Sequence, residues 1–184
     1  KDMTEKPEKY RLTAVEMSNT FRQALLHDNL INEHDTSIIF YDLEFLSDRI
    51  ENIKNLFPST TLHAIAVKAN PLIKILSLIK KAEVGLEVAS LPELYLAEKV
   101  GFSPDKIVFD SPAKTRMELE TALKLGVYIN ADSFDELDRI GEILQGLNSK
   151  SKIGVRVNPQ VGKGSIISTS VADSISKFGI PINE

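Results

Sequence analysis

A lysine that follows a short apolar run is the residue in this sequence best suited to nucleophilic chemistry. Lys68 comes directly after residues 62–67, which have the length and composition of a buried strand. Because side chains alternate along a strand, Lys68 would share a face with Ala64 and Ala66, and we expect open space in front of its amine. An amine at a desolvated strand end can act as a nucleophile and form a Schiff base. The alternative is a solvated lysine where a strand enters its loop.

Two further charged residues fall inside apolar runs. Glu87 lies in the run 84–88, and a carboxylate one strand along could pair with Lys68 or orient it. Arg156 lies in the run 153–157, where a carboxylate could neutralise it or a cofactor ring could accept its hydrogen bonds. An exposed edge position for Glu87 and a structural ion pair for Arg156 remain open alternatives.

The elements that must position these residues repeat regularly. Apolar runs begin at residues 62, 84, 107, 127 and 153, after an earlier run at 38–41, and helical patterns separate them. Such alternation predicts successive βα units and a parallel sheet. A Rossmann-type sheet would need a Gly-rich turn, which neither 41–44 nor 68–71 supplies. We therefore predict an α/β fold, the N-terminal part of a parallel (β/α)8 TIM-type barrel with about five of eight strands, whose chemistry lies at the C-terminal strand ends.

Helix boundaries carry recognisable signals. Four Ser or Thr residues are followed three positions later by Glu, as in a capping box: Thr13 with Glu16, Ser90 with Glu93, Thr115 with Glu118, and Ser133 with Glu136. The Asn-Pro pair at 70–71 predicts a further helix start. We expect Gly85, Gly101 and Gly126 to end helices in the left-handed conformation. Residues 13–28 are predicted to form a separate amphipathic helix before the repeat.

Composition argues against several classes of function. The 184 residues carry 22 basic and 26 acidic side chains, a net charge of −4, so there is no electrostatic case for nucleic acid. No apolar run approaches the roughly 18–20 residues of a membrane-spanning helix. The polar N-terminus lacks the apolar core of a signal peptide, and we expect a cytoplasmic protein. With no cysteine, and three histidines without ligand spacing, we expect no metal site.

Taken in order, the motifs resemble a known family. The run Ala-Val-Lys-Ala-Asn-Pro at 66–71 resembles the cofactor-lysine signature of the fold-type III pyridoxal-phosphate-dependent decarboxylases, the group that holds diaminopimelate, ornithine and arginine decarboxylases. Further matching motifs follow the family's order, at residues 41–42, 87–94, 107–109, 111–115, 130–137, 155–159 and 176–180. The likeness covers about residues 38–182. It is nearest to the diaminopimelate decarboxylase branch and to relatives in siderophore synthesis.

The resemblance implies a carbon–carbon lyase that decarboxylates a small amino acid, diaminopimelate-like or from a siderophore pathway. Lys68 would bind pyridoxal 5'-phosphate as a Schiff base and later assist protonation. Glu87 stands where the family usually has Asp, close to that lysine. Arg156 matches an arginine beside the cofactor ring, and Glu93 matches a Glu near the lysine. A homodimer is also implied.

The resemblance extends only to an N-terminal portion of such an enzyme. We expect a helical lead-in at 1–36, an incomplete pyridoxal-phosphate-binding barrel at 37–184, and a C-terminal β domain outside this chain. The phosphate-binding and substrate-selecting residues would follow Glu184, so we expect these 184 residues alone to be inactive. An amino-acid racemase or a pyridoxal-phosphate carrier on the same barrel, and a non-catalytic fragment, remain alternatives.

Overall fold

The repeated apolar runs form a five-stranded parallel sheet. Its strands are β1 (Ala64–Ala66), β2 (Gly85–Val88), β3 (Ile107–Asp110), β4 (Tyr128–Ala131) and β5 (Ile153–Val155). The order in the sheet is the order in the chain, β1-β2-β3-β4-β5. A doubly wound sheet reverses its order at a switch point, whereas a βα barrel adds each strand beside the last. The order therefore supports the predicted barrel portion and not the Rossmann-type alternative.

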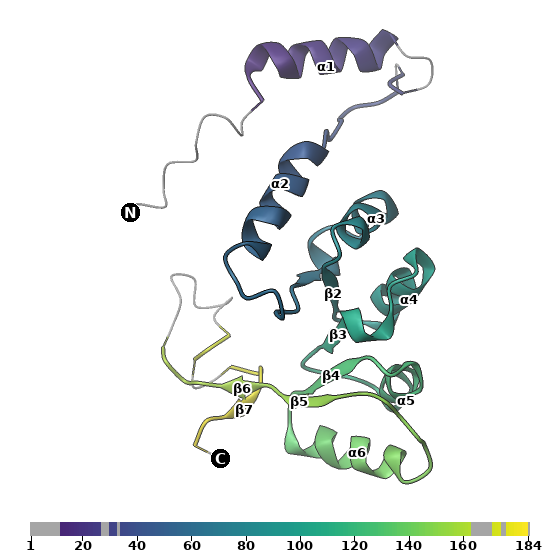
Figure 1. Ribbon diagram of the computed structural model, residues 1–184, viewed down its shortest axis with the longest axis vertical. Helices are drawn as coiled ribbons and strands as arrows, with labels where there is room; N and C mark the ends of the chain where they lie inside the picture. Colours follow the sequence, from purple (N-terminus) through teal and green to yellow (C-terminus); the bar gives the residue numbers. More distant parts are fainter. Residues whose placement is uncertain (1–11, 27–29, 33, 163–170, 174–175, 184) are drawn as a thin grey trace. The chain divides into compact units, whose positions relative to one another are not determined.

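Helices connect the strands and cover one side of this sheet in the computed structural model (Figure 1). They are α3 (Ile73–Lys81), α4 (Leu91–Val100), α5 (Arg116–Leu125) and α6 (Phe134–Leu144). The core lies between helices and sheet, and its largest fully buried side chains include Leu76, Leu86, Leu94, Phe109, Leu119 and Ile129. Alternation along the strands turns a second set of side chains to the other face of the sheet. That face carries the polar residues from which the candidate site is built.

The structure describes residues 12–26, 30–32, 34–162, 171–173 and 176–183. The chain divides into two compact units, Lys1–Arg49 and Ile50–Glu184. The division predicted from the sequence, between residues 36 and 37, does not coincide with the boundary between these units and stays a prediction. Helix α1 (Ala14–Leu26) confirms the helix expected at 13–28, and helix α2 (Leu43–Lys54) follows it.

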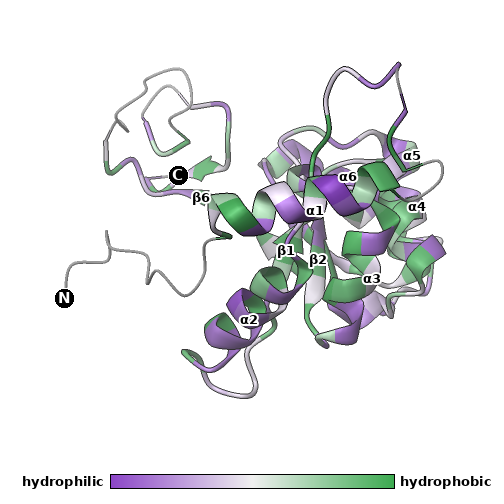
Figure 2. Cartoon of the chain, turned by 90° about the horizontal axis from the view of Figure 1, so that it is seen from above, coloured by the Kyte–Doolittle hydropathy of each residue, from purple (hydrophilic) through white to green (hydrophobic). Residues whose placement is uncertain are grey.

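The described part of the first unit exposes many apolar side chains and holds no strand. No residue of α1 is buried, and Figure 2 shows hydrophobic and hydrophilic residues side by side along α1 and α2. The run at 38–41, which the sequence pattern placed in the strand series, is not a strand, and Ile39 is 75% exposed. The described part of this unit holds no strand to pair with it, and unpaired backbone forms no ladder. No described helix is long and apolar enough to cross a membrane.

The capping boxes are confirmed at two of the four positions. At Thr13 and at Thr115 the hydroxyl accepts from the Glu backbone N–H while the Glu carboxylate accepts from the Thr backbone N–H. At Ser90 the box is wrong, because the hydroxyl makes no capping bond and Glu93 instead accepts from the Ala89 N–H at 2.7 Å.

The box at Ser133 is half formed. The hydroxyl caps α6, but the Glu136 carboxylate accepts from the Asp132 N–H at 2.9 Å. At Ser90 and at Ser133 a strand ends just before the helix starts, so the unpaired N–H belongs to the residue before the cap. The glutamate therefore reaches one residue further back than the box predicts.

Two other boundary predictions need correction. Helix α3 begins at Ile73, with Leu72 as N-cap, because the Asn70 side chain accepts from the Leu72 N–H at 3.2 Å and makes a turn before the helix. Gly85 does not end a helix but opens β2, where a Cβ would collide with the Lys106 carbonyl oxygen. Gly101 and Gly126 do end helices, at φ of 84° and 82°.

Removing the cap of α5 should loosen its first turn. In Thr115→Ala the hydroxyl that accepts from the Glu118 N–H and donates to the Glu118 carboxylate is lost, while the backbone N–H of residue 115 can still donate to that carboxylate. The lost cap lowers local stability by about 1 kcal/mol. We expect amides in the first turn of α5 to exchange with solvent about fivefold faster, measured by hydrogen exchange and mass spectrometry. Thr115→Ser keeps the hydroxyl and should exchange like the parent; equal rates in all three proteins would contradict this role.

Candidate active site

Charged residues gather at the C-terminal ends of the strands, on the face of the sheet away from the helices. The register aligns Ala66 with Glu87, and Asp110 with Asn130. In a parallel sheet aligned residues project to the same face, so Glu87, Asp110 and Asn130 share that face. This is the end of a βα barrel where reactions occur.

Lys68 lies at this end, but not on a strand. β1 stops at Ala66, and residues Val67–Ala69 form a 3-10 turn that closes with the Asn70 N–H on the Val67 carbonyl at 3.0 Å. The predicted strand alternation therefore ends before Lys68, and the expected shared face with Ala64 and Ala66 is wrong. The Lys68 side chain is exposed, so the desolvated setting expected from the sequence is also absent. The turn instead presents the amine beyond the end of β1.

The pKa of Glu87 depends on the other charged residues of this cluster. Burial raises the pKa of its carboxyl group above the ordinary value of 4.5, and the positive charge of Lys68 opposes that rise. The negative charges of Asp110 and Glu93 raise the pKa further, and Arg156 lowers it. Glu87 is half-buried on an inner strand, not exposed at an edge. The Lys68 and Arg156 charges therefore both act on one carboxyl group.

The raised pKa can be measured directly. We expect carboxyl-carbon NMR of the cofactor-free full-length protein to place the Glu87 titration midpoint above 4.5, with Glu87→Gln identifying the resonance. The folded state binds this proton more tightly than the unfolded chain does. Its contribution to stability is therefore full below pH 4.5 and is lost as the pH rises through the raised value. Glu87→Gln should consequently gain stability relative to the parent as the pH rises through that window.

Glu118 provides the internal control for this titration. Although its partial burial raises the pKa, hydrogen bonds from Thr115 and the Leu91 N–H outweigh burial and hold the pKa below 4.5. A Glu87 midpoint at or below that of Glu118 would contradict the proposed environment.

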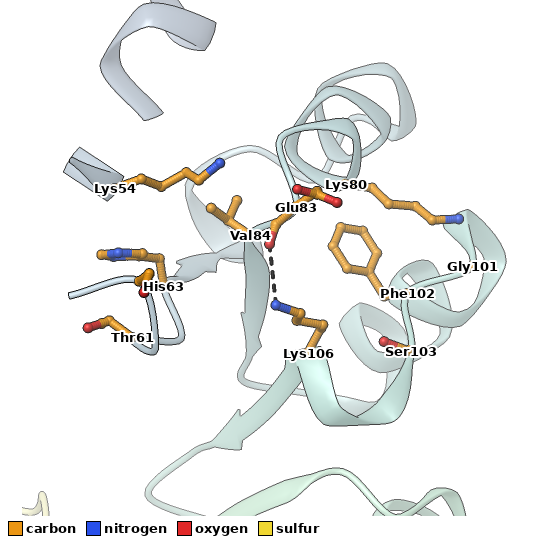
Figure 3. Close-up of a pocket in the computed structure, with 11 residues that line it drawn as sticks. Lys54, Thr61, His63, Lys80, Glu83, Val84, Gly101, Phe102, Ser103 and Lys106 are labelled. Atoms are coloured by element: carbon orange, nitrogen blue, oxygen red, sulfur yellow. Dashed lines mark hydrogen bonds between the residues drawn. The ribbon is translucent and has the colours of Figure 1, made fainter. Parts of the chain in front are cut away.

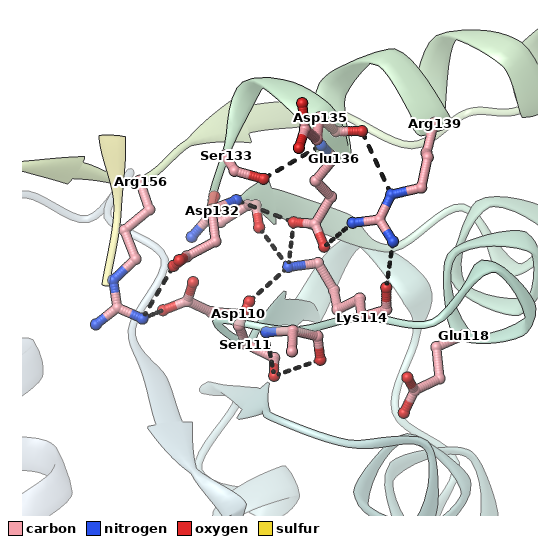
Figure 4. A network of polar contacts seen from close by, with 12 residues as sticks. Asp110, Ser111, Lys114, Glu118, Asp132, Ser133, Asp135, Glu136, Arg139 and Arg156 are labelled. Atoms are coloured by element: carbon pink, nitrogen blue, oxygen red, sulfur yellow. Dashed lines mark hydrogen bonds and ion pairs between the residues drawn. The ribbon is translucent and has the colours of Figure 1, made fainter. Parts of the chain in front are cut away.

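Arg156 has two carboxylate partners. Its Nη1 atom lies 3.4 Å from Asp110 Oδ2 and 3.7 Å from Asp132 Oδ1 (Figure 4). The guanidinium lies 4.5 Å from the centre of the Phe178 ring. The ion-pair alternative for Arg156 is thus realised. Among the described residues, Oδ1 of Asp110 and Oδ1 of Asp132 are buried without any hydrogen-bond partner. Each of these two carboxylates therefore keeps one buried oxygen atom that accepts no hydrogen bond from a described residue.

The motif at 176–180 lies beside Arg156. Strand β6 (Val157–Asn158) pairs in parallel with β7 (Ile180–Pro181), and the Ile180 N–H donates to the Arg156 carbonyl at 2.8 Å. The Gly179 N–H donates to Asp132 Oδ2 at 3.0 Å. Main-chain and side-chain contacts together therefore bring this motif to the site.

A buried ion pair close to the site could not be recognised from the sequence. The Lys114 amine lies 2.7 Å from the Glu136 carboxylate, and their side chains are 0% and 2% exposed. The same amine donates to the carbonyls of Ser111 at 2.7 Å and Asn130 at 2.8 Å. The sequence showed Glu136 only as a capping residue, and Lys114 follows its strand with no distinctive spacing. Their pairing depends on contacts between successive βα units, which a linear pattern does not reveal.

A hollow of about 540 Å³ opens at the opposite end of the sheet (Figure 3). Its lysines contact main-chain carbonyls near helix ends: Lys54 that of Ala82, Lys80 that of Val100, and Lys106 that of Glu83. Cations at helix C-termini stabilise the helices, which accounts for these lysines. Among the described residues, no group of His, Asp and Glu is arranged to hold a metal ion.

The cluster at the C-terminal ends combines three chemical capacities. Lys68 offers an amine that can attack a carbonyl carbon. Glu87 has a carboxyl group whose raised pKa brings proton exchange closer to neutral pH. Arg156 offers guanidinium donors held between two carboxylates. Such a cluster suits covalent capture of a carbonyl compound followed by proton transfer.

Comparisons with known proteins agree with this geometry. Residues 43–184 match the family described as "Pyridoxal-dependent decarboxylase, pyridoxal binding domain". The chain is 35% identical over 158 residues to diaminopimelate decarboxylase from Helicobacter pylori, covering 84% of this chain and 38% of that protein. It is 34% identical over 137 residues to L-glutamyl-[BtrI acyl-carrier protein] decarboxylase from Niallia circulans, covering 74% and 32%.

A solved structure is similar as well. The crystal structure of the Helicobacter pylori diaminopimelate decarboxylase complexed with L-lysine superposes with a TM-score of 0.75 and 31% identity, covering 90% of this chain and 40% of that one. The chain thus spans between about a third and two-fifths of the length of these relatives.

Proposed function

Because the chain belongs to the pyridoxal-dependent decarboxylase family, we propose that it forms the cofactor-binding part of an enzyme that decarboxylates an amino acid. In this proposal Lys68 holds pyridoxal 5'-phosphate covalently, while Glu87 and Arg156 contact or orient the cofactor. The observation that carries the proposal is the exposed amine of Lys68 at the C-terminal end of β1, electrostatically coupled to the half-buried carboxyl group of Glu87.

The residues present fit such a cofactor. On the site-facing side of the sheet, a Cβ at Gly154 would lie only 2.6 Å from Asn130 Oδ1, so a larger residue there would crowd this face. Oδ1 of Asp110 and of Asp132 are buried acceptors without a donor among the described residues. A polar ligand bound there could supply the donors that buried acceptors require.

When bound, pyridoxal phosphate supplies a ring that takes up the electron pair left behind as a carboxylate departs. Lys68 provides the amine that holds the cofactor and can deliver a proton to the carbon that has lost its carboxylate. Glu87 can exchange a proton with its surroundings closer to neutral pH than an ordinary carboxyl group. Arg156, neutralised in part by Asp110 and Asp132, presents hydrogen-bond donors at the same end of the sheet.

The substrate, assembly and location belong to the same proposal. The names of the relatives support an α-amino acid substrate, with diaminopimelate foremost. A homodimer follows from the resemblance of the motifs to the family. A cytoplasmic location rests on the polar, mildly acidic sequence.

The proposal is tested with the full-length protein and pyridoxal phosphate. We expect an absorbance band near the edge of the visible range as the cofactor binds covalently, and release of carbon dioxide from diaminopimelate or a related amino acid. A racemase would invert the substrate without releasing carbon dioxide, and a carrier or a non-catalytic protein would consume no substrate. Absence of the band would refute cofactor binding itself.

A further inference from the structure

Asp132 touches both Arg156 and the 176–180 segment. Its Oδ1 atom lies 3.7 Å from Arg156 Nη1 (Figure 4). Its Oδ2 atom accepts the Gly179 N–H at 3.0 Å. Its side chain is only 5% exposed. One buried carboxylate therefore links the Arg156 guanidinium to Gly179, which lies 47 residues after Asp132 in the sequence.

The neighbours of Asp132 hold it in place. Its backbone N–H donates to Glu136 Oε2 at 2.9 Å, and the same oxygen lies 2.7 Å from the Lys114 amine. Lys114 in turn donates to the Asn130 carbonyl at 2.8 Å, two residues before Asp132. The start of α6 and the end of β4 are thereby fixed to one buried ion pair, which limits the freedom of the Asp132 backbone.

The contacts of Arg156 are incomplete. A guanidinium has five N–H donors. The ion pairs within the described residues join Nη1 to Asp110 at 3.4 Å and to Asp132 at 3.7 Å, and the guanidinium carbon lies 4.5 Å from the centre of the Phe178 ring. A purely structural arginine pairs in a bidentate manner where it can. This arginine is held by charge and by a ring, and no described residue forms a hydrogen bond with its guanidinium at the distances expected of one.

We propose that Asp132 is a positioning residue, which aims the Arg156 guanidinium at the cofactor and anchors the 176–180 segment beside it. This inference rests on the proposed function, in which Arg156 lies next to the bound cofactor. Asp110 shares the first task, since it contacts Arg156, but has no contact with Gly179. The two tasks of Asp132 can therefore be separated by substitution.

Two substitutions at this position have different expected effects. Asp132→Asn keeps an oxygen that can accept the Gly179 N–H, but it removes the charge that holds Arg156. Asp132→Ala removes both contacts. Asp135→Asn is the matched control, because Asp135 is exposed in the first turn of α6, three residues after Asp132, and no ion pair or hydrogen bond joins its side chain to Arg156 among the described residues.

The first readout is the dissociation constant of pyridoxal phosphate from the full-length protein. It is measured from the intensity of the absorbance band. We expect Asp132→Asn and Asp110→Asn each to raise it about tenfold or more, as substitutions of residues that orient a ligand-binding group commonly do. Asp135→Asn should leave it unchanged. A merely structural loss would reduce the fraction of protein that binds, but would not change the dissociation constant of the fraction that remains folded.

The second readout needs no cofactor. Lys177 is exposed and lies within the anchored segment, so trypsin cleavage after it reports release of that segment. In the cofactor-free protein we expect Asp132→Ala to be cut about tenfold faster than the parent, and Asp132→Asn to be cut at the parental rate.

The outcomes separate this inference from the proposed function. If the parent protein shows the absorbance band, but Asp132→Asn binds the cofactor with parental affinity, the positioning role is overturned and the proposed function stands. If Asp132→Ala is cut no faster than the parent, the anchoring role is overturned. If the parent shows no band at all, the proposed function fails and the positioning role falls with it.

Discussion

The full-length Lys68→Ala protein is expected to show no absorbance band with pyridoxal phosphate and to lose decarboxylation by about a thousandfold or more. Alanine has no amine, so the covalent attachment that the proposal assigns to Lys68 becomes impossible. Removing a residue that forms a covalent bond in catalysis abolishes nearly all rate enhancement, because no neighbouring group replaces it. The site itself should persist, since the Lys68 side chain is exposed and lies on a turn closed by main-chain atoms.

The matched control for this variant is Lys74→Ala. Lys74 is an exposed lysine on α3, only six residues further along the chain. Its substitution should leave both the absorbance band and the rate of carbon dioxide release unchanged. A band of parental intensity in Lys68→Ala would remove Lys68 from the proposed role, whatever the activity of the protein.

Lys114→Met is expected to destabilise the protein by about 3–5 kcal/mol. The substitution leaves the Glu136 carboxylate, 2% exposed, without its cation, and it deprives the carbonyls of Ser111 and Asn130 of a donor. An unpaired charge in such a site is far less favourable than either a paired charge or an apolar group. The measurement is the urea concentration at which secondary structure is lost, or the soluble yield if the variant fails to fold.

A second substitution should restore much of this loss. In the double variant Lys114→Met with Glu136→Gln, the buried charge is gone while the glutamine oxygen can still accept the Asp132 N–H. We expect the double variant to be more stable than Lys114→Met alone. Lys124→Met, at an exposed lysine on α5, should change stability by less than about 0.5 kcal/mol. A double variant no more stable than the single one would show that the ion pair is not the source of the loss.

The fold could be predicted from sequence because its signal is local and repeated. Each strand of the sheet is marked by its own apolar run, and the helix ends at Gly101 and Gly126 follow from glycine's tolerance of positive φ. The earlier run at 38–41, which is not among the five predicted strands, has the composition of a strand, but the described part of its unit holds no strand to pair with it. Composition predicts that a run can form a strand, and only a neighbouring strand makes it one.

The site was predictable only in part. Glu87 and Arg156 stood out because charges inside apolar runs require an explanation, and the structure places Arg156 between two carboxylates. Asp110 is the last residue of β3 and Asp132 directly follows β4, positions where polar residues are common, so nothing in the sequence distinguished them. Their importance arises from register, which aligns the ends of β3, β4 and β5 and cannot be read from one strand alone. For Lys68 the position at a strand end was correct, whereas the conformation of the turn was not.

The most direct test of the central proposal is reduction of the full-length protein with borohydride in the presence of pyridoxal phosphate, followed by peptide mapping. Reduction makes the link between a lysine and the cofactor permanent, so mass spectrometry identifies the lysine. We predict that the cofactor's mass is added to the peptide containing Lys68 and to no other. Labelling confined to a different lysine, or no labelling at all, would contradict the assignment of Lys68 as the residue that holds the cofactor.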